Sequence, residues 1–517
     1  MTLTFPSAKC SCQKPRLTPN AAYFDEILAA IWFGYEICAK LRDLISLSQW
    51  RQVMIAPPSL PDSPEEQFVA ARTLLSEILR VPQIEAIVDF DDRPNTKMVY
   101  TQAVTIWLLI LQRLRGGASL QTVVSEAVEH QADLFPDNKR VHEGTLGENT
   151  SSFSAARKRL PLDAIERFSR CVCDHLGRTV EPVFDDRRVF IIDGTTITLP
   201  PTPVLKKAFP PATNQLGETV WPVAMLMVAA EMQTGCILVP KIDPMYGPNN
   251  SSEAKQAREI VGDLPSRSIV LADSCFGIFS VAHHTRAAGH DFLFRLSMLR
   301  LKAHRKKAEL IDQGEGYKSC RLTWRPSAKE RNTNPDLPAD ASLDVFLHEV
   351  ELEDGATLAL VTSMSFDALC LAELYRRRYD IEFDIRDLKV TMDTENLRAK
   401  SVEMVMKELM GSVIAYNLVS QLRRGAAKLA RVEPRRLSFT GVWVSFQVQL
   451  LGRSCETFEQ WSKAFTKALV SASKRRLPNR KSPRSYPRVA HPRRAKTTKF
   501  QKSLRKKTKS PDPPPPE

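Results

Sequence analysis

The sequence predicts a mixed α/β protein in which a central sheet lies between two helical regions. Three observations support this fold class. Before about residue 180, apolar residues recur mostly at helical spacing. Short apolar runs follow, and two of them end at an aspartate, an order of strands and helix that is compatible with a mixed sheet. Helical spacing returns from Asp367 to about Leu429.

The first 180 residues are expected to be mostly helical after a loose start. Residues 1–20 hold three prolines and show no apolar periodicity, which predicts a flexible leader. Helical patterns then cover residues 21–46, 65–79 and 99–128, and Gly116-Gly117 interrupts the last of them.

Strand-like runs dominate the next segment. One run at residues 188–192 ends at Asp193, and another at residues 268–272 ends at Asp273. Between them lie strand-like runs at residues 221–230 and 235–241, with a hairpin turn at 231–235, followed by a helix at 252–261. Both aspartates therefore stand at the carboxyl end of a predicted strand.

A second group of strands is predicted before the C-terminal helical region. The runs lie at residues 292–296, 319–324, 345–352 and 357–362, with a polar stretch at residues 329–341 between them. This strand-rich segment separates Asp273 from the helical pattern that begins at Asp367.

The positive charge of the chain is concentrated at one end. The net charge is +14, and residues 474–517 alone hold 16 Lys or Arg against two acids, so the remaining chain is formally neutral. A cationic segment on a neutral body suggests a polyanionic partner bound with release of counterions. A solubilising or disordered tail is the alternative.

Cysteine usage and hydropathy exclude several classes of protein. The ten cysteines are scattered, and the pairs Cys10/Cys12 and Cys171/Cys173 lack the partner sets of a structural zinc site. The longest apolar runs, residues 105–111 and 221–230, are too short to cross a bilayer. We therefore expect a soluble intracellular protein without a membrane partner and without a secretory signal.

The segment from Leu374 to Lys389 carries the pattern that points to chemistry. If the segment is helical, two stripes of side chains lie next to each other. The apolar stripe is Leu374, Ile381, Ile385, Leu388 and Met392. The polar stripe is Tyr375, Arg378, Glu382 and Lys389. An acid, two cations and a phenol thus line the edge of a helix that packs on the core.

This arrangement suits a metal and a phosphate. A carboxylate at the edge of the core can bind a divalent cation together with carboxylates from nearby strand ends. Arginine and lysine beside it can hold phosphates. The alternative is a solvated charged helix with i,i+4 ion pairs such as Arg378 with Glu382.

The four polar residues match a known signature. Tyr375, Arg378, Glu382 and Lys389 have the spacing Y-x2-R-x3-E-x6-K, and the chain here resembles the insertion sequence four family of DDE transposases. Upstream, residues 189–196 resemble the strand of the first aspartate. Ser252-Glu253, followed by residues 270–273, resembles the region of the second aspartate. The resemblance covers roughly residues 152–424.

The sequence departs from the family pattern at two points. The second aspartate is followed by Ser274-Cys275-Phe276 instead of Arg-Gly-aromatic, and glycine comes only at Gly277. Pro201 stands where an acid is common in the family. The first departure concerns the local turn and leaves the aspartate itself in place.

The resemblance implies a fold and an activity. The fold would be a ribonuclease H-like mixed-sheet core with an inserted β-rich subdomain, flanked by helical N- and C-terminal regions. Asp193, Asp273 and Glu382 would be the catalytic residues and would bind two Mg²⁺ ions, for which Mn²⁺ can substitute. The enzyme would cut and rejoin DNA at terminal inverted repeats in cut-and-paste transposition, as a homodimer in a synaptic complex with double-stranded DNA.

Further DNA contacts are expected from several cations. By the resemblance, Tyr375, Arg378 and Lys389 would bind DNA. A short cationic helix at residues 154–160 contains Arg157, Lys158 and Arg159, and it follows a helix start at residues 149–152. This helix is either a second DNA contact or a solvated face.

The expected domain organisation follows these patterns. It comprises a flexible leader (1–20), a helical N-terminal DNA-binding region (21–180), the first part of the catalytic core (181–289), a β-rich insertion (290–365), the rest of the core with the glutamate helix (366–430), a helical C-terminal region (431–473) and a basic disordered tail (474–517). A transposase of this kind would act in the cytoplasm, on the nucleoid.

Other candidate sites and functions were weighed against this hypothesis. The histidines at positions 283, 284 and 290 match no zinc spacing and favour a surface helix. Asp185-Asp186 beside Arg187-Arg188 favours a solvated turn, and Trp324 favours a core position over stacking on a flipped base. The competing functions are a catalytically inactive or domesticated relative, a metal-dependent nuclease without strand transfer, and a structural nucleoid protein.

Overall fold

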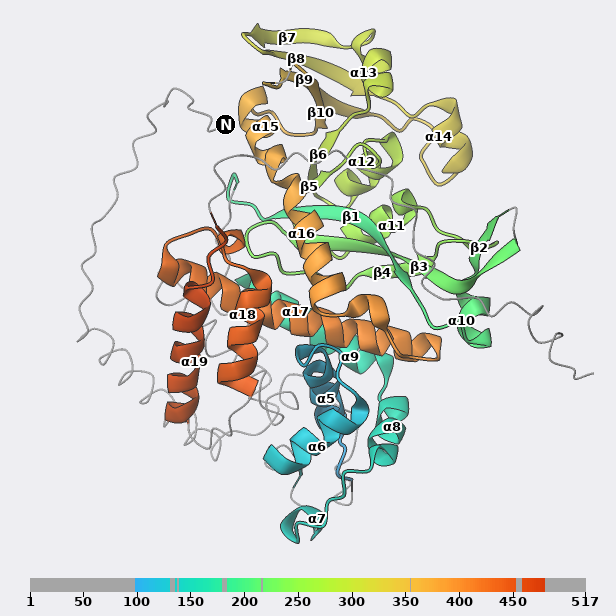
Figure 1. Cartoon of the computed structure of the whole chain (residues 1–517). Coiled ribbons are helices and arrows are strands. Elements are labelled where there is room, and N and C mark those ends of the chain that lie inside the picture. Colours follow the sequence, from blue (N-terminus) through green and yellow to red (C-terminus); the bar gives the residue numbers. More distant parts are fainter. Residues whose placement is uncertain are drawn as a thin grey trace, which may run out of the picture. The chain divides into compact units, whose positions relative to one another are not determined.

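The computed structural model describes most of the chain between residues 98 and 478 (Figure 1). Within that range, residues 131–134, 137–138, 179–183, 215–216, 354 and 452–457 are not described. The predictions for the leader, for the helices at residues 21–46 and 65–79, and for nearly all of the basic tail lie outside the described residues. Contacts divide the chain into a unit from Leu44 to Leu477 and a second unit formed by the two ends. The elements described below belong to the first unit.

A sheet of ten strands is the centre of the described part of the chain. Its strands follow the order β2-β3-β1-β5-β6-β10-β9-β8-β7, and β4 pairs with β3. β1 pairs with β5 and β5 with β6 in parallel, whereas the other pairs are antiparallel. The predicted mixed α/β class is confirmed. The strands are β1 (Val189–Thr198), β2 (Pro211–Asn214), β3 (Gly217–Glu231), β4 (Lys241–Pro244), β5 (Ile269–Ala272), β6 (Asp291–Arg295), β7 (Glu309–Gly314), β8 (Tyr317–Trp324), β9 (Leu343–Glu351) and β10 (Thr357–Thr362).

The helices lie on both faces and at the ends of this sheet (Figure 1). They are α5 (Gln102–Leu114), α6 (Leu120–His130), α7 (Lys139–His142), α8 (Thr150–Arg159), α9 (Leu162–Arg178), α10 (Pro203–Ala208), α11 (Glu253–Val261), α12 (Phe279–Ala287), α13 (Met298–Arg305), α14 (Ala328–Thr333), α15 (Ala368–Arg376), α16 (Asp380–Arg386), α17 (Val402–Ala430), α18 (Phe439–Phe446) and α19 (Phe458–Ser473). α17 is 29 residues long, is buried along most of its length and packs against α5, α9, α18 and α19.

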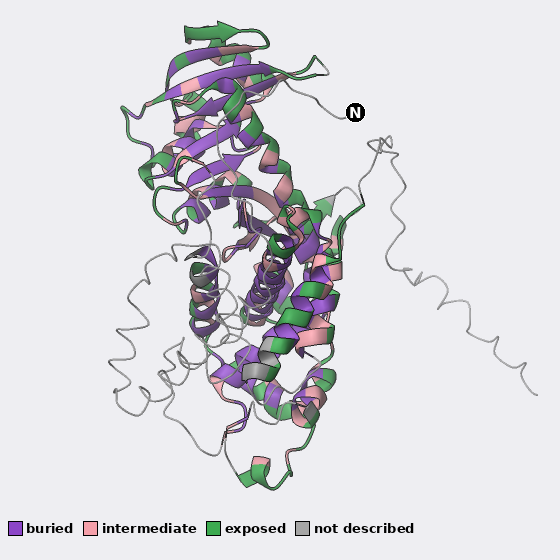
Figure 2. Ribbon diagram, turned by 90° about the vertical axis from the view of Figure 1, so that its left-hand side faces the viewer, coloured by how far each residue is buried: buried purple, intermediate pink, exposed green. Residues whose placement is uncertain are grey.

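Two apolar cores form because side chains along a strand alternate between the faces of the sheet. In β1, Val189 and Ile191 belong to the core that also contains α5, α9 and α17, whereas Phe190 and Ile192 belong to the core beneath α11 and α12. In Figure 2 the strands are largely buried. Each residue after Ile192 can therefore be assigned to one face by its position in the alternation.

The strand-rich segment at residues 290–365 continues the same sheet. β6 pairs with β5 on one side and with β10 on the other, so β10, β9, β8 and β7 extend the sheet outward from the core (Figure 1). β7 was not predicted from the sequence. All of its residues are exposed and it forms the edge of the sheet, so no burial imposes an alternating pattern on it.

One predicted strand is wrong. Residues 235–241 form only an isolated bridge between Ile237 and Ala230, and β4 begins at Lys241. The side chain of Asn417 in α17 accepts a hydrogen bond from the Ile237 N–H and donates one to its carbonyl oxygen, both at 2.8 Å. A buried side-chain amide thus satisfies the backbone groups that a neighbouring strand would otherwise pair.

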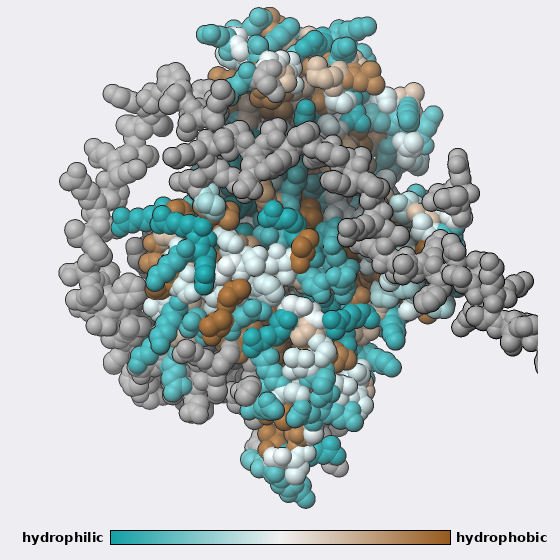
Figure 3. All heavy atoms as spheres, viewed as in Figure 1, coloured by the Kyte–Doolittle hydropathy of each residue, from teal (hydrophilic) through white to brown (hydrophobic). Residues whose placement is uncertain are grey.

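The predicted helix boundaries agree better with the structure. Gly116 and Gly117 both have left-handed backbone angles, with φ of 69° and 71°, and they separate α5 from α6. Asn149 caps α8, since its side chain accepts a hydrogen bond from the N–H of Ser151. In the described part of the chain, none of the helices combines the length and apolar character needed to cross a membrane. The described surface in Figure 3 is mostly hydrophilic or of intermediate hydropathy.

Candidate active site

Asp193 lies within β1, two residues beyond the last residue of that strand that pairs with β5, and Asp273 directly follows β5. The prediction that the strand ends at Asp193 is wrong, because β1 continues to Thr198 as the partner of β3. β1 and β5 are in register at Ile191 and Leu271, so a continuation by two residues places Asp193 level with Asp273. The alternation along each strand puts both side chains on the face where Ile191 and Leu271 are buried, the face on which α15 to α17 pack. Both aspartates are half-buried.

The proximity of the two carboxylates is visible in their electrostatics. Burial, followed by the negative charge of Asp273, raises the pKa of Asp193 to about 6. The N–H of Gly194 donates a hydrogen bond to Asp193 Oδ1 at 2.8 Å, which opposes this rise, as does the nearby Arg378. The pair therefore holds negative charge that the surrounding protein compensates only in part.

A tight turn follows Asp273. Its Oδ1 accepts a hydrogen bond from the N–H of Cys275 at 2.8 Å. Two residues later, Gly277 lies so close to the carbonyl oxygen of Arg295 that a side chain there would collide with the backbone of β6. The departure from the family pattern at residues 274–276 thus leaves a turn that depends on glycine at position 277.

Glu382 lies on a nearly continuous helical run that passes across the sheet (Figure 1). The run consists of α15, a 3-10 turn (η2, Arg377–Tyr379), α16 and a π-helical turn (η3, Asp387–Thr391). Its predicted apolar stripe is confirmed. Every member of that stripe is buried: Leu374, Ile381, Ile385, Leu388 and Met392. α16 contacts β1 and β3, which brings the polar stripe to the strand that carries Asp193.

Arg378 connects the glutamate to the first aspartate. Its guanidinium is buried, and Nη2 lies 2.8 Å from Glu382 Oε1 while Nη1 lies 3.8 Å from Asp193 Oδ2. The Glu382 side chain remains 51% exposed. The i,i+4 ion pair that the sequence offered as an alternative is therefore present, and it forms part of the same cluster of acids.

The oxygen donors of this cluster are of the kind that binds a divalent cation. The acids do not converge on one metal position in this structure. Among the described residues, no three His, Cys, Asp or Glu side chains converge closely enough to hold a metal ion as they stand. The Arg378 guanidinium already places a positive charge between Asp193 and Glu382. Carboxylate oxygens are the ligands that Mg²⁺ and Mn²⁺ prefer, so the donor chemistry of these residues fits such an ion.

The two remaining signature residues border the same strand. Tyr375 is buried, and this burial raises the pKa of its hydroxyl. Lys389 Nζ lies 3.3 Å from Thr195 Oγ1 and 3.0 Å from Glu395 Oε1, so it reaches β1 two residues beyond Asp193. Lys389 therefore stands beside the carboxylates, whereas Tyr375 supports the helical run from inside.

The prediction of a cationic DNA-binding helix needs one correction. Arg157 is buried, and its guanidinium forms an ion pair with Glu408 at 2.6 Å, so it does not present its charge to a partner. Lys158 and Arg159 are exposed. Sequence spacing alone did not show which of these three cations is buried, because α8 has one buried face and its last turn is entirely basic.

The other candidates occupy structural positions. Trp324 is buried, with its ring edge-on to Phe279 and His304, as expected for a core residue. Asp185 and Asp186 form an exposed turn with left-handed φ angles of 51° and 50°. This turn agrees with the solvated position that the adjacent arginines predicted.

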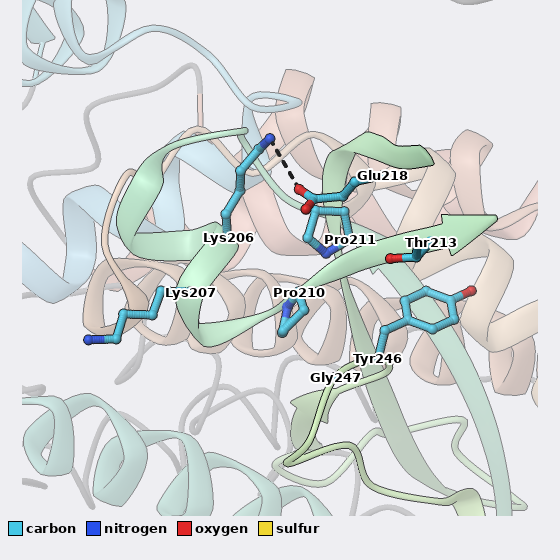
Figure 4. Close-up of a pocket in the computed structure, with 8 residues that line it drawn as sticks. All are labelled: Lys206, Lys207, Pro210, Pro211, Thr213, Glu218, Tyr246 and Gly247. Carbon is cyan, nitrogen blue, oxygen red and sulfur yellow. Dashed lines mark ion pairs between the residues drawn. The ribbon is translucent and has the colours of Figure 1, made fainter. Parts of the chain in front are cut away.

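A cavity of about 470 Å³ lies apart from the carboxylates (Figure 4). None of the predicted catalytic residues lines it. Its lining consists of Lys206, Lys207, Pro210, Pro211, Thr213, Glu218, Tyr246 and Gly247. Lys206 is directed toward Glu218, with 3.6 Å between Nζ and Oε1. The cavity opens between α10 and β2, and its lining holds two lysines and one glutamate.

Glu253 is the residue that the sequence did not single out as part of the site. It is the first residue of α11, after the N-cap Ser252, and its carboxylate approaches Gly194 beside Asp193. The available signal was the Ser252-Glu253 pair in the resemblance to the second-aspartate region, together with a glycine directly after the first aspartate.

Comparisons with known proteins show which proteins the chain resembles. Residues 185–418 match the protein family described as "Transposase DDE domain". The chain is 26% identical over 298 residues to the "Transposase InsG for insertion sequence element IS4" of Escherichia coli (strain K12). That match spans 56% of this chain and 65% of the relative.

One solved structure is more weakly similar to this chain. It is the piggyBac transposase synaptic complex with hairpin DNA, at 10% identity, with 82% of this chain and 87% of that chain covered. The TM-score is 0.32, a value too low to establish a common fold.

Proposed function

From the match of residues 185–418 to the transposase DDE domain family, we propose that the protein is the transposase of an insertion sequence. It would cleave DNA at the terminal inverted repeats of its element and join the freed 3′ ends to target DNA. Asp193, Asp273 and Glu382 would be the catalytic residues, with Mg²⁺ as the natural cofactor and Mn²⁺ as a substitute. Double-stranded DNA would be the substrate, bound by a homodimer that brings two element ends together.

The strand order supports a ribonuclease H-like core for this activity. The strands β4-β3-β1-β5-β6 lie in that order, with β3 antiparallel to both β4 and β1, and with β1, β5 and β6 parallel. Asp193 lies on the first strand of this set in the chain, and Asp273 follows the fourth. β7 to β10 would be the insertion between the core strands and the glutamate helix.

One observation carries the proposal. Asp193 and Asp273 lie level with each other just beyond the paired residues of the parallel strands β1 and β5, on the face across which the helical run with Glu382 passes, and Arg378 contacts both Asp193 and Glu382. Asp193 and Asp273 are 80 residues apart in the chain, and Asp273 and Glu382 are 109 residues apart. Acids that served only for solubility would have no reason to lie on one strand pair or against one guanidinium.

The residues of the chain would act in distinct ways. Bound divalent cations supply a polarised water or 3′-hydroxyl and neutralise charge on the leaving oxygen. Asp193, Asp273 and Glu382 would hold the cations. Arg378, released from Glu382, would turn toward a DNA phosphate, and Lys389 would contact a second phosphate.

Substitution of the acids tests the proposal. A plasmid that carries the inverted repeats flanking the gene would be incubated with full-length protein and Mg²⁺, and nicking and 3′-end joining would be measured. Asp193→Asn, Asp273→Asn and Glu382→Gln should each lower cleavage by about a thousandfold or more, because the metal ions lose an essential ligand. End binding, measured by gel shift, should remain.

A matched control separates catalysis from general charge. Asp186→Asn changes an exposed acid in the turn before β1 and should cleave like the wild type. Full cleavage by the Glu382 variant would refute the assignment. Retained end binding without cleavage by the wild-type chain would instead indicate an inactive relative, and cleavage without joining would indicate a nuclease.

A further inference from the structure

Three segments that are far apart in the chain meet near the start of α17. The carboxylate of Glu408 lies 2.6 Å from the guanidinium of Arg157 in α8, and it accepts a hydrogen bond from the backbone N–H of Arg398 at 3.0 Å. Thr202, the N-cap of α10, donates a hydrogen bond from its side chain to the carbonyl oxygen of Lys400 at 3.2 Å. In Figure 1, α8 and α10 accordingly lie near the same end of α17. The end of α8, the loop that precedes α17 and α10 therefore border one another.

These three segments present cations that have no acid partner. Lys158 and Arg159 of α8, Lys207 of α10, and Arg398 and Lys400 of the loop are all exposed. Within the part of the chain that the structure describes, none of the five forms an ion pair. They form the basic surface of the molecule, which folding assembles from separate parts of the chain.

The acids beside the basic surface are already paired with other lysines. Glu218 Oε1 lies 3.6 Å from Lys206 Nζ. Glu403 Oε1 lies 2.6 Å from the Nζ of Lys407, whose side chain is completely buried. Figure 4 shows that Lys207 points away from Glu218, which Lys206 contacts. The basic surface therefore keeps an excess of positive charge, and its complement is a polyanion.

The cavity between α10 and β2 lies at the edge of the basic surface. Lys207 and Tyr246 both line it (Figure 4). The Tyr246 side chain is exposed, so its hydroxyl can donate a hydrogen bond to a ligand. Lysine and tyrosine side chains are among the groups that bind the phosphate oxygens of DNA. The cavity thus adds a hollow with two such groups to the basic surface.

The basic surface adjoins the carboxylates along β1. Lys389, which contacts Thr195 of β1, also lies 3.0 Å from Glu395, three residues before Arg398. β1 ends at Thr198, a short distance before α10. At about 3.3 Å per residue, the five residues after Asp193 extend the strand by about 17 Å. Successive base pairs are about 3.4 Å apart, so a duplex that runs along β1 from a phosphate at the carboxylates reaches α10 after about five base pairs.

We propose that the basic surface binds the phosphates of duplex DNA beyond the scissile phosphate. The proposal rests on the function proposed above and names the path that the DNA takes next to the site. The ligand is the duplex that is continuous with the phosphate at the carboxylates, because the basic surface adjoins the strand that carries Asp193. Lysine and arginine contacts with phosphates position a duplex but do not read its base sequence.

The salt dependence of DNA binding tests how many phosphates the basic surface contacts. Full-length protein would be titrated, by fluorescence anisotropy, into a labelled duplex that carries one inverted repeat with its flanking DNA. The triple variant Lys207→Ala, Arg398→Ala, Lys400→Ala should bind about tenfold more weakly or worse. It should also reduce the slope of log affinity against log salt by about 2 to 3, because each phosphate contact contributes about 0.9.

A second triple variant is the matched control. Lys302→Ala, Lys306→Ala, Lys307→Ala removes the same amount of charge at and just after α13, where all three lysines are exposed. Its salt slope should change by less than about 1. Equal losses in the two triple variants would overturn the proposal, because total charge would then explain both. Since all six side chains are exposed, the melting temperatures of both variants should match that of the wild type.

Truncated duplexes locate the contact. Cutting the duplex to about four base pairs on one side of the cleavage position should weaken binding by the wild type, because the basic surface then lacks its phosphates. The Lys207, Arg398 and Lys400 variant should bind that truncated duplex and the full-length duplex with nearly equal affinity. A wild type that is insensitive to truncation on either side would contradict the proposal. So would a variant as sensitive to truncation as the wild type.

Cleavage by the wild-type protein separates this inference from the proposed function. If the wild type cleaves at the element ends while the Lys207, Arg398 and Lys400 variant keeps the wild-type affinity and salt slope, only the path of the DNA is refuted. If the wild type neither binds nor cleaves the element ends, the proposed function is refuted as well.

Discussion

The helical run that carries Glu382 has charged residues on two sides, and the sides differ in how those charges are paired. Toward α17, Asp384 is completely buried and is contacted by Tyr416, Arg423 and Arg435. Toward β1 and β5, Asp193 and Asp273 are half-buried, and the Arg378 guanidinium lies 3.8 Å from Asp193. The first side contains matched charges, and the second contains excess acid.

The matched side has a structural role. The Tyr416 hydroxyl donates a hydrogen bond to Asp384 Oδ1 at 3.1 Å, and Arg435, from the 3-10 turn η5 (Pro434–Arg436), binds the other oxygen. Arg423 also lies 3.8 Å from Asp387. These contacts join α16, α17 and the segment after α17, so they fix the helix from which Glu382 projects. If the proposed function holds, a site that binds metal and DNA needs such a fixed support.

The largest expected effect comes from breaking the matched side. Asp384→Ala should destabilise the protein by about 3–5 kcal/mol, because it removes the completely buried carboxylate that Arg423 and Arg435 share and leaves them only the longer contacts with Asp387 and Asp380. Urea unfolding followed by circular dichroism would measure the loss. A change below about 1 kcal/mol would show that this network does not hold the helix.

The unmatched side should instead make the stability of the protein depend on pH. The pKa of Asp193 is raised to about 6, above its value of about 3.9 in an unfolded chain. The folded state therefore binds the proton more tightly, so this group favours folding below about pH 4, and its contribution is lost as the pH rises through about 6.

The stability of Asp193→Asn relative to wild type reports this effect. In buffer with EDTA, the wild type should lose at most about 3 kcal/mol relative to the Asn variant between about pH 4 and pH 6. Urea midpoints measured across this range would show it. Parallel curves for the two proteins would contradict the electrostatic account of the pair.

Arg378 is a paired cation that lies beside the acids of the unmatched side. Arg378→Ala should raise the Mn²⁺ affinity several-fold in the absence of DNA, because a cation that competes for Asp193 and Glu382 is gone. DNA cleavage should fall by about tenfold, since a phosphate loses its partner. Arg376→Ala, which removes an exposed arginine paired with Glu373, is the control. Unchanged metal affinity in Arg378→Ala would show that the guanidinium does not compete with the metal.

The smallest effect is expected at α8, where one cation is buried in an ion pair and the two cations that follow it are exposed. Lys158→Ala with Arg159→Ala should lower DNA affinity a few-fold and reduce its salt dependence without changing stability, since both side chains are exposed. Arg157→Ala should instead lower stability, because Glu408 would be left without one of its two arginines. Gel shifts at several salt concentrations, with melting temperatures, would distinguish the two. Equal losses of DNA affinity in both variants would remove the distinction.

The sequence by itself determined the local features of this protein. The aspartate at the end of β5, the apolar stripe of the Glu382 helix, the cap of α8 and the Gly116-Gly117 break all depend on residues close together in the chain. Their periodicity and composition were sufficient to predict them. The four-residue signature belongs to the same class, because its spacing is a property of one helical run.

Only the tertiary structure decided which of these features meet. The pairing of β6 with β10, the position of Glu253 against Gly194, the burial of Arg157 on Glu408 and the satisfaction of Ile237 by Asn417 each join residues far apart in the chain. Local periodicity states that a side chain faces the interior or the solvent but does not identify its partner. Charge pairing is decided by that partner, and so the matched and unmatched sides of one helix became distinguishable only in the folded chain.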